Sequence, residues 1–143
     1  MGNDSIVGTW KLVSAVVKPA PGGETRNLWG ENPSGLLTYT GDGRMSAIIA
    51  SGGRRPLSAA DPDMAPAEER AEAFATFGAY AGGYTFDGDR VTHHVEIAWF
   101  QNWVGTDQIR FVSLQGSRLT LSTAPVWVGG VQVPTELTWQ RLT

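Results

Sequence analysis

Apolar and polar residues alternate along most of this 143-residue chain, and short turn segments separate the alternating runs. Alternation with a period of two is typical of β-strands that bury one face. The predicted strands cover residues 6–17, 36–40, 44–50, 83–86, 90–99, 105–114, 118–123 and, starting at 132 or 134, a last run to 142. Roughly eight strands in hairpin order predict an all-β, antiparallel up-and-down barrel, because that number can close around side chains or one small ligand.

The connections between these strands carry strong turn signals. Glycine and aspartate stand at residues 41–43 and 87–89, and Gly116 stands between residues 115 and 117. Glycine adopts positive φ without strain, so each of these segments predicts a tight hairpin. Residues 19–33, which are rich in Gly, Pro and Asn, predict a longer loop over one mouth of the barrel.

One segment breaks the alternation and predicts an amphipathic helix over residues 61–81. Asp63 is placed to cap it, and Pro66 suits its first turn. Its apolar stripe comprises Ala73, Phe74, Phe77 and Tyr80. The flexible linker 51–53 and the aromatic stripe favour a position across a barrel opening, as a lid, and packing along the outer wall is the alternative.

Length and composition limit the classes of function. A chain of 143 residues predicts one domain, 1–143, with a single core. The net charge of -3 and the absence of a Lys/Arg run argue against nucleic acid as a partner. The chain has no cysteine, which excludes disulfides, thiolate metal sites and a cysteine nucleophile. Residues 1–5 do not begin a secretory signal and no run is long and apolar enough for a membrane span, so we expect a cytoplasmic protein.

The two histidines, His93 and His94, are adjacent on a predicted strand and therefore point to opposite faces. They cannot bind one metal ion together, and we expect no metal site. The apolar phase of Val91, Val95 and Ile97 places His93 inside and His94 outside. An inward His93 is either a core histidine with a satisfied hydrogen bond or a ligand contact and general acid or base.

Arg110 lies on a predicted strand with apolar residues on both faces, so the pattern does not fix its direction. A cation inside the barrel would need a carboxylate, an enolate or a ligand oxygen as its partner. An ordinary surface position near Glu96 or Glu136 is the orientation that the sequence alone favours.

Aromatic residues gather in or beside the predicted turns. They are Trp29, Trp99, Phe100, Trp103 and Trp127. A ring of such side chains at an opening suits a flat hydrophobic or aromatic ligand, and the alternative is that they pack loops onto the barrel. Tyr39 and Tyr84 could place hydroxyl groups in a cavity or serve packing only. Motifs for a serine nucleophile, a dinucleotide or a phosphate loop are absent from the sequence, and we expect no cofactor.

The two ends of the chain carry a further signature. Gly8 precedes Trp10 by two residues, and Arg141 lies on the last predicted strand. A tryptophan that plugs the narrow end of a small barrel needs bare backbone beside it, and a cation can stack on its outer face. These residues resemble the closing signature of lipocalin-like barrels. Further blocks at 36–46, 79–84, 91–95, 102–106, 108–110 and 137–141 resemble the lipocalin-like domain family of bacteria and fungi in order.

This resemblance implies the fold more strongly than the activity. It implies a role for Tyr80, Tyr84, His93 and Arg110, which match positions that the family pattern retains. Barrels of this kind serve as carriers of small hydrophobic molecules and as isomerases or cyclases of natural-product pathways.

Three functions stay open. The first is a barrel that binds a small hydrophobic or aromatic molecule, the second is a cofactor-independent isomerase or cyclase that acts in the same cavity, and the third is a barrel filled by its own side chains with a structural role. His93 and Arg110 are the catalytic candidates. The ligand-binding candidates are Tyr39, Met45, Tyr80, Tyr84, Trp99, Trp103 and Leu121, with Leu12 also on the expected wall. A homodimer is kept open.

Overall fold

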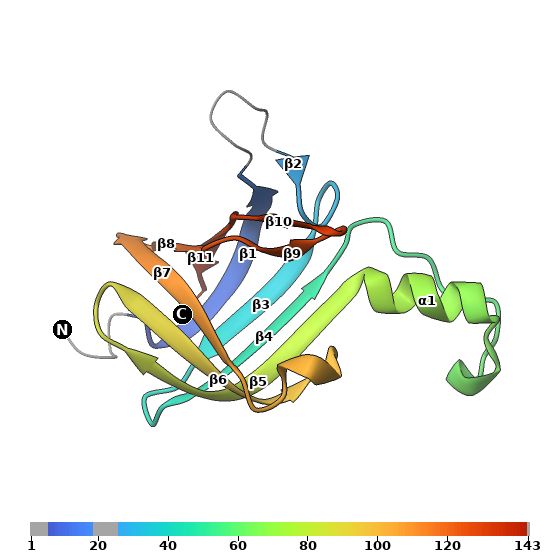
Figure 1. Ribbon diagram of the computed structural model, residues 1–143, viewed down its shortest axis with the longest axis horizontal. Helices are drawn as coiled ribbons and strands as arrows, with labels where there is room; N and C mark the ends of the chain where they lie inside the picture. The colour runs from blue at the N-terminus through green and yellow to red at the C-terminus, as the bar shows by residue number, and fades with distance from the viewer. Residues whose placement is uncertain (1–5, 19–25, 143) are drawn as a thin grey trace.

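Eight antiparallel strands close into a barrel in the computed structural model, which describes residues 6–18 and 26–142 (Figure 1). The strands of the ring are β1 (Gly8–Val17), β3 (Ser34–Tyr39), β4 (Arg44–Ala50), β5 (Phe77–Phe86), β6 (Arg90–Ala98), β7 (Asp107–Gln115), β8 (Arg118–Ser122) and β11 (Thr135–Arg141). Each strand pairs with the next, and β11 returns to pair with β1. The predicted all-β barrel is confirmed. A two-residue strand, β2 (Arg26–Asn27), is added beside the end of β1.

A small hairpin outside the ring was not predicted. Strands β9 (Val126–Val128) and β10 (Val131–Val133) pair with each other and form a separate two-stranded sheet. Gly129 and Gly130 turn the chain between them with positive φ. The last predicted strand therefore splits into β10 and β11. Pro134 lies at the break, where it has no N–H to continue a ladder.

The helix prediction was wrong in length. Helix α1 (Ala67–Ala75) follows a short 3₁₀ turn, η2 (Pro62–Met64), and residues 77–81 belong to β5 instead. Those residues pair in register with β4, from Phe77 opposite Ala50 onwards, and this long-range ladder overrides the local helical pattern. Asp63 is not the helix cap: it lies inside the 3₁₀ turn, where its N–H donates to Asp61, and the N-cap of α1 is Pro66, one residue before the first turn.

Helix α1 lies at the rim of the barrel and extends away from it (Figure 1). None of its residues is fully buried. Only its last turn approaches the interior: Ala75 lines the cavity described below, and the Phe74 ring lies 6.3 Å from that of Trp99. The helix is therefore neither a lid across the opening nor a cover along the wall. In the part of the chain that the structure describes, no helix is long and apolar enough to cross a bilayer.

The signature residues at the two chain ends meet at one end of the barrel. Arg141 stacks over the Trp10 ring, with its guanidinium carbon 4.2 Å from the ring centroid. The same guanidinium donates to the Val7 carbonyl oxygen at 2.7 Å, and the Trp10 indole N–H donates to the Ile6 carbonyl oxygen at 3.0 Å. These contacts plug this end, as the sequence predicts.

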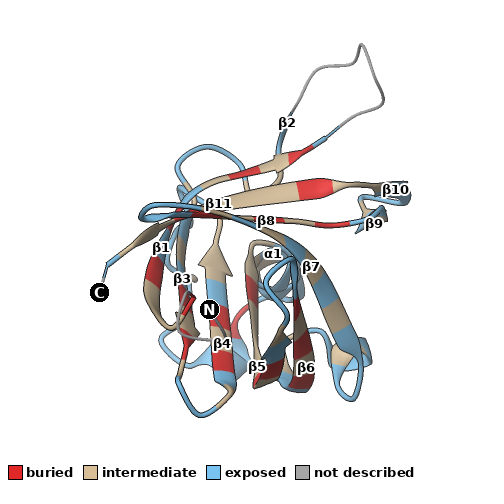
Figure 2. Ribbon diagram, turned by 90° about the vertical axis from the view of Figure 1, so that its left-hand side faces the viewer, coloured by how far each residue is buried: buried red, intermediate tan, exposed pale blue. Residues whose placement is uncertain are grey.

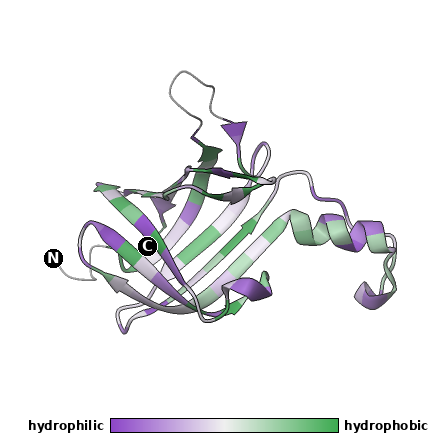
Figure 3. Ribbon diagram, viewed as in Figure 1, coloured by the Kyte–Doolittle hydropathy of each residue, from purple (hydrophilic) through white to green (hydrophobic). Residues whose placement is uncertain are grey.

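The barrel interior is packed next to this plug. Hydrophobic and hydrophilic residues alternate along the strands, and the buried residues lie on the inward face (Figures 2 and 3). The packed core includes Trp10, Leu12, Tyr39, Met45, Tyr84, Val91 and Leu119. Removing this much apolar surface from water is the main stabilising contribution to a small domain.

A bulge between β5 and β6 depends on one glycine. The register shifts between Ala81 and Gly82, which brings the Gly82 backbone against the His94 carbonyl group. A Cβ atom at position 82 would overlap that carbonyl oxygen, whereas one at the neighbouring Gly83 would lie an ordinary 3.5 Å from its nearest atom. The bulge therefore requires glycine at 82 and fixes where His93 enters the barrel.

Substitution at this glycine should test the bulge. Gly82→Ala is expected to lower the free energy of unfolding by about 2 kcal/mol, because backbone must move to relieve the overlap. Gly83→Ala is the matched control, with an expected change within about 0.5 kcal/mol. Urea denaturation of both variants measures the difference, and equal stability of the two would contradict this account.

Candidate functional site

The half of the barrel away from the plug holds an open cavity of about 590 Å³. Strand β4 changes from packed to open along its length: Met45 lies in the core, whereas Ala47 and Ile49 line the cavity. On β11 the lining runs from Thr135 through Leu137 to Trp139. The barrel is therefore not filled by its own described side chains, which removes the main support for a purely structural role.

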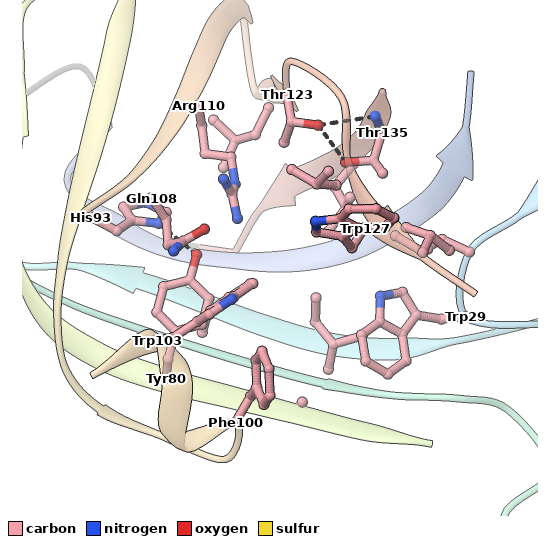
Figure 4. A pocket seen from close by; sticks show the side chains of 18 of the residues that line it. Trp29, Tyr80, His93, Phe100, Trp103, Gln108, Arg110, Thr123, Trp127 and Thr135 are labelled. Atoms are coloured by element: carbon pink, nitrogen blue, oxygen red, sulfur yellow. Dashed lines mark hydrogen bonds between the residues drawn. The ribbon is translucent and has the colours of Figure 1, made fainter. Parts of the chain in front are cut away.

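Aromatic side chains form much of the cavity wall (Figure 4). Trp99 and Trp103 meet edge to face at 5.3 Å between ring centroids, and Phe100 lies 6.1 Å from Trp99. Trp103 comes from a short 3₁₀ turn, η3 (Gln101–Trp103), between β6 and β7. Trp29 and Trp127 reach the same cavity from the segment after β2 and from the β9–β10 hairpin. Flat rings held by one another present a broad apolar surface to a bound molecule.

His93 is the centre of a polar group that adjoins this aromatic cluster, since the Tyr80 ring meets Trp103 edge to face at 5.4 Å. Its Nε2 lies 2.6 Å from the Tyr39 hydroxyl oxygen, and its Nδ1 lies 2.6 Å from the Tyr80 hydroxyl oxygen. His93 and Tyr80 line the cavity, whereas Tyr39 belongs to the packed core behind them. The chain Tyr39–His93–Tyr80 therefore connects the core to the cavity through hydrogen bonds.

The charge state of His93 follows from its surroundings. Burial lowers its pKa to about 3, and the positive charge of Arg110 adds to the effect. The imidazole is thus neutral at pH 7, with one nitrogen that donates and one that accepts. With the proton on Nδ1, His93 donates to Tyr80 and accepts from Tyr39, so the Tyr80 hydroxyl is left to donate into the cavity. An acceptor in the cavity selects this tautomer.

Arg110 points into the barrel, so the outward orientation favoured by the sequence was wrong. Along β7 the inward positions are those of Gln108, Arg110, Val112 and Leu114, which are half-buried between exposed neighbours. The Arg110 guanidinium lies on the same side of the cavity as Tyr80, His93 and Gln108 (Figure 4). Burial raises the pKa of Tyr80, and the positive charge and N–H groups of the nearby Arg110 partly oppose this effect.

Two further polar features lie on the wall. Thr123 and Thr135 bond to each other, with 3.0 Å between their hydroxyl oxygens, so they are satisfied without a ligand. The Trp139 indole N–H is buried and has no acceptor among the described residues, in contrast to that of Trp10. A buried donor without a partner is costly, so this position carries an energetic penalty in the described structure.

The structure separates the predicted site residues into two groups. Tyr80, His93, Trp99, Trp103, Arg110 and Leu121 line the cavity. Leu12, Tyr39, Met45 and Tyr84 lie in the packed core instead, because they occupy the parts of their strands next to the plug. Tyr39 still contacts the site through His93, and the Tyr84 hydroxyl donates to the Thr40 carbonyl oxygen at 2.7 Å.

Several lining residues were not among the predicted site residues. The sequence places Trp29, Phe100 and Trp127 near turns, and the structure brings their side chains to the cavity wall. Gln108, Thr123, Thr135 and Trp139 also line the cavity. The inward position of Gln108 could be predicted once Arg110 is known to point inward, because residues two apart on a strand share a face. Among the described residues, no group of three His, Cys, Asp or Glu side chains could hold a metal ion.

His94 faces away from the barrel, as the alternation predicts. Its Nδ1 lies 2.8 Å from an Asp107 carboxylate oxygen, and its Nε2 lies 2.8 Å from the Thr85 hydroxyl oxygen. The two adjacent histidines thus differ sharply in environment, which makes them a natural experimental pair.

Comparison with known proteins identifies relatives of this chain. A family model described as a lipocalin-like domain matches residues 7–142. The chain is also similar to the 4'-hydroxy-3'-methoxypropiophenone carrier protein of Aspergillus oryzae, with 37% identity over 84 residues. That alignment covers 52% of this chain and 76% of the relative.

The neutral, buried His93 predicts a pH-dependent stability. Its folded pKa of about 3 lies below the ordinary 6.5, so the unfolded chain binds more protons and stability falls as the pH drops below 6.5. Between pH 7 and pH 5 the wild type should lose about 2 kcal/mol more of its free energy of unfolding than His93→Gln loses. Urea denaturation at both pH values measures this.

His94→Gln is the matched control for this experiment. His94 lies partly exposed on the outer face, so this variant controls for the loss of a histidine without any change inside the barrel. A His93→Gln variant with the same pH dependence as the wild type would show that His93 is not held neutral by burial.

Proposed function

Because the chain belongs to the lipocalin-like domain family, we propose that it is a carrier that binds a small aromatic molecule with at least one oxygen substituent inside the barrel. The observation that carries this proposal is the half-open interior, in which an aromatic wall adjoins a hydrogen-bonding group. The bound molecule would enter through the open end, opposite the Trp10 plug.

The size of the cavity supports a small-molecule ligand. Pockets for such ligands measure about 300–1,000 Å³, and this cavity of about 590 Å³ falls within that range. Its wall combines mostly apolar side chains with a few convergent polar groups, which is the composition of a site that selects by shape and orientation.

The arrangement of the polar groups supports an oxygen substituent. The Tyr80 hydroxyl, the Arg110 guanidinium and the Gln108 amide lie near one another and offer N–H and O–H donors (Figure 4). An aromatic ligand that stacks near Trp99 and Trp103 could place an oxygen toward these donors. The Aspergillus oryzae relative is named for an aromatic ketone with hydroxyl and methoxyl groups, a ligand of this chemical class.

Filling the cavity should abolish binding. Ala47 lines the cavity on β4, and Ala47→Phe would place a ring in the space that the ligand needs. We expect affinity for 4'-hydroxy-3'-methoxypropiophenone to fall by about tenfold or more, while the barrel stays folded. Quenching of tryptophan fluorescence measures the affinity, since several tryptophans border the cavity.

Ala79→Phe is the matched control, because Ala79 pairs with the exposed Ile48 and shares its outward face. It should bind the ketone like the wild type. If the wild type does not bind aromatic ketones or related phenols at millimolar concentration, the carrier function is wrong. If Ala47→Phe binds as tightly as the wild type, the ligand lies elsewhere.

A cofactor-independent isomerase or cyclase is a second candidate, supported by the donors at Tyr80 and Arg110. Such donors could stabilise an oxygen on which negative charge develops, and restricting the conformation of a reactant can supply about 7–11 kcal/mol without a nucleophile. His93 is a poor general base at pH 7, because its pKa is about 3. This ranks the carrier first.

Exchange of ketone α-protons with D₂O separates the two candidates. A carrier should leave the exchange rate of propiophenone unchanged, whereas an enolising enzyme should raise it, and Tyr80→Phe should lower that rate more than the affinity. Proton NMR measures the exchange directly. The cytoplasmic location and the homodimer considered from the sequence stay predictions.

A further inference from the structure

Arg110 is the only charged side chain among the described residues that line the cavity. All other lining residues are apolar, aromatic or neutral polar groups, if His93 is counted in its neutral state. A single cation on an otherwise neutral wall gives the cavity a positive electrostatic potential. Because the wall is partly desolvated, this potential is screened less than it would be in bulk water.

The described structure gives Arg110 no carboxylate partner. The ion pairs among the described residues join Lys18 to Glu136, Arg44 to Glu96, Arg90 to Asp87 and His94 to Asp107. The Arg110 guanidinium instead donates to the carbonyl oxygen of its neighbour Ile109 at 3.1 Å and lies within reach of the Tyr80 hydroxyl. Five N–H donors on one guanidinium leave capacity for a further acceptor.

We infer that the cavity takes its aromatic ligand as an anion, with a phenolate or carboxylate oxygen held by the Arg110 guanidinium and the Tyr80 hydroxyl. This inference rests on the proposed carrier function and specifies the ligand class of the same site. It disfavours cationic aromatic ligands, since the positive charge of Arg110 repels them and the described wall offers no acid to pair with them.

The hydrogen-bond chain behind Tyr80 supports an anionic acceptor. With the His93 proton on Nδ1, Tyr39 donates to His93, His93 donates to the Tyr80 oxygen, and Tyr80 donates to the ligand. Each hydrogen bond in the series Tyr39–His93–Tyr80 then has its donor on the core side and its acceptor on the cavity side. Hydrogen bonds in such a series polarise one another, and a charged acceptor at the end gains most from this.

A pair of probes that share a nitrophenyl ring tests the inference, one with a charged oxygen and one with a neutral, methylated oxygen. 4-Nitrophenol ionises to a phenolate with a distinct visible absorption, whereas 4-nitroanisole has the same nitrophenyl ring and stays neutral. At a pH where the free phenol is fully ionised, we expect the wild type to bind 4-nitrophenolate about tenfold or more tightly than 4-nitroanisole in equilibrium dialysis. At lower pH, binding should shift the phenol toward its ionised form, which absorbance reports.

Variants at Arg110 test whether the preference for the phenolate depends on the charge of the guanidinium. Arg110→Gln should lose the preference for the phenolate and keep its affinity for 4-nitroanisole, and Arg110→Lys should retain part of the preference. Arg70→Gln, on the exposed surface of α1, is the matched control and should behave like the wild type. Retained binding of 4-nitroanisole by Arg110→Gln also shows that the variant is folded.

The possible results separate this inference from the carrier function. Equal binding of the two probes, or a phenolate preference that survives in Arg110→Gln, would overturn the anionic ligand and leave the carrier function standing. Failure of both probes to bind would overturn the anionic ligand, and binding of 4'-hydroxy-3'-methoxypropiophenone then decides the carrier function separately. A third probe, 4-nitrobenzoate, tells the two anions apart: a preference for it over 4-nitrophenolate assigns the site to carboxylates, and the reverse assigns it to phenolates.

Discussion

Pairing between the first and last strands of the ring is the constraint on which the rest of this structure depends. β1 and β11 join residues from the two ends of the chain, for example Trp10 with Arg141, and this ladder closes the sheet. Closure removes the free strand edges and creates an inside. The stacking of Arg141 on Trp10 strengthens the same junction and plugs one end. Without closure there would be neither a packed core nor a cavity.

One half of the closed barrel is packed with side chains and the other half is open, so stability and ligand binding depend on different halves. Large side chains such as Trp10, Tyr39 and Met45 fill the end next to the plug, whereas small residues such as Ala47 line the half toward the opening. Where small residues face the cavity, the van der Waals contacts of a filled barrel are not made. The packed half supplies stability, and the open half supplies a binding volume.

The polar groups of the cavity are arranged at the boundary between these halves. His93 contacts the core through Tyr39 and the cavity through Tyr80, and burial keeps it neutral by lowering its pKa. Arg110 keeps its charge on the cavity side of this boundary. The neutral hydrogen-bond series behind this single cation orients a ligand acceptor without a buried acid. Such an arrangement suits the binding of a ligand better than the abstraction of a proton from it.

The sequence by itself determined the barrel, its closing contacts and the inward direction of His93, because these follow from period-two alternation, turn glycines and residue types at the two ends. Only the tertiary structure decided that residues 77–81 form a strand, since their pairing with β4 is long-range. It also decided that Arg110 faces inward and that Tyr39, Met45 and Tyr84 pack in the core. Alternation tells which face a residue occupies, but whether that face is filled or empty at a given depth depends on side chains from all eight strands.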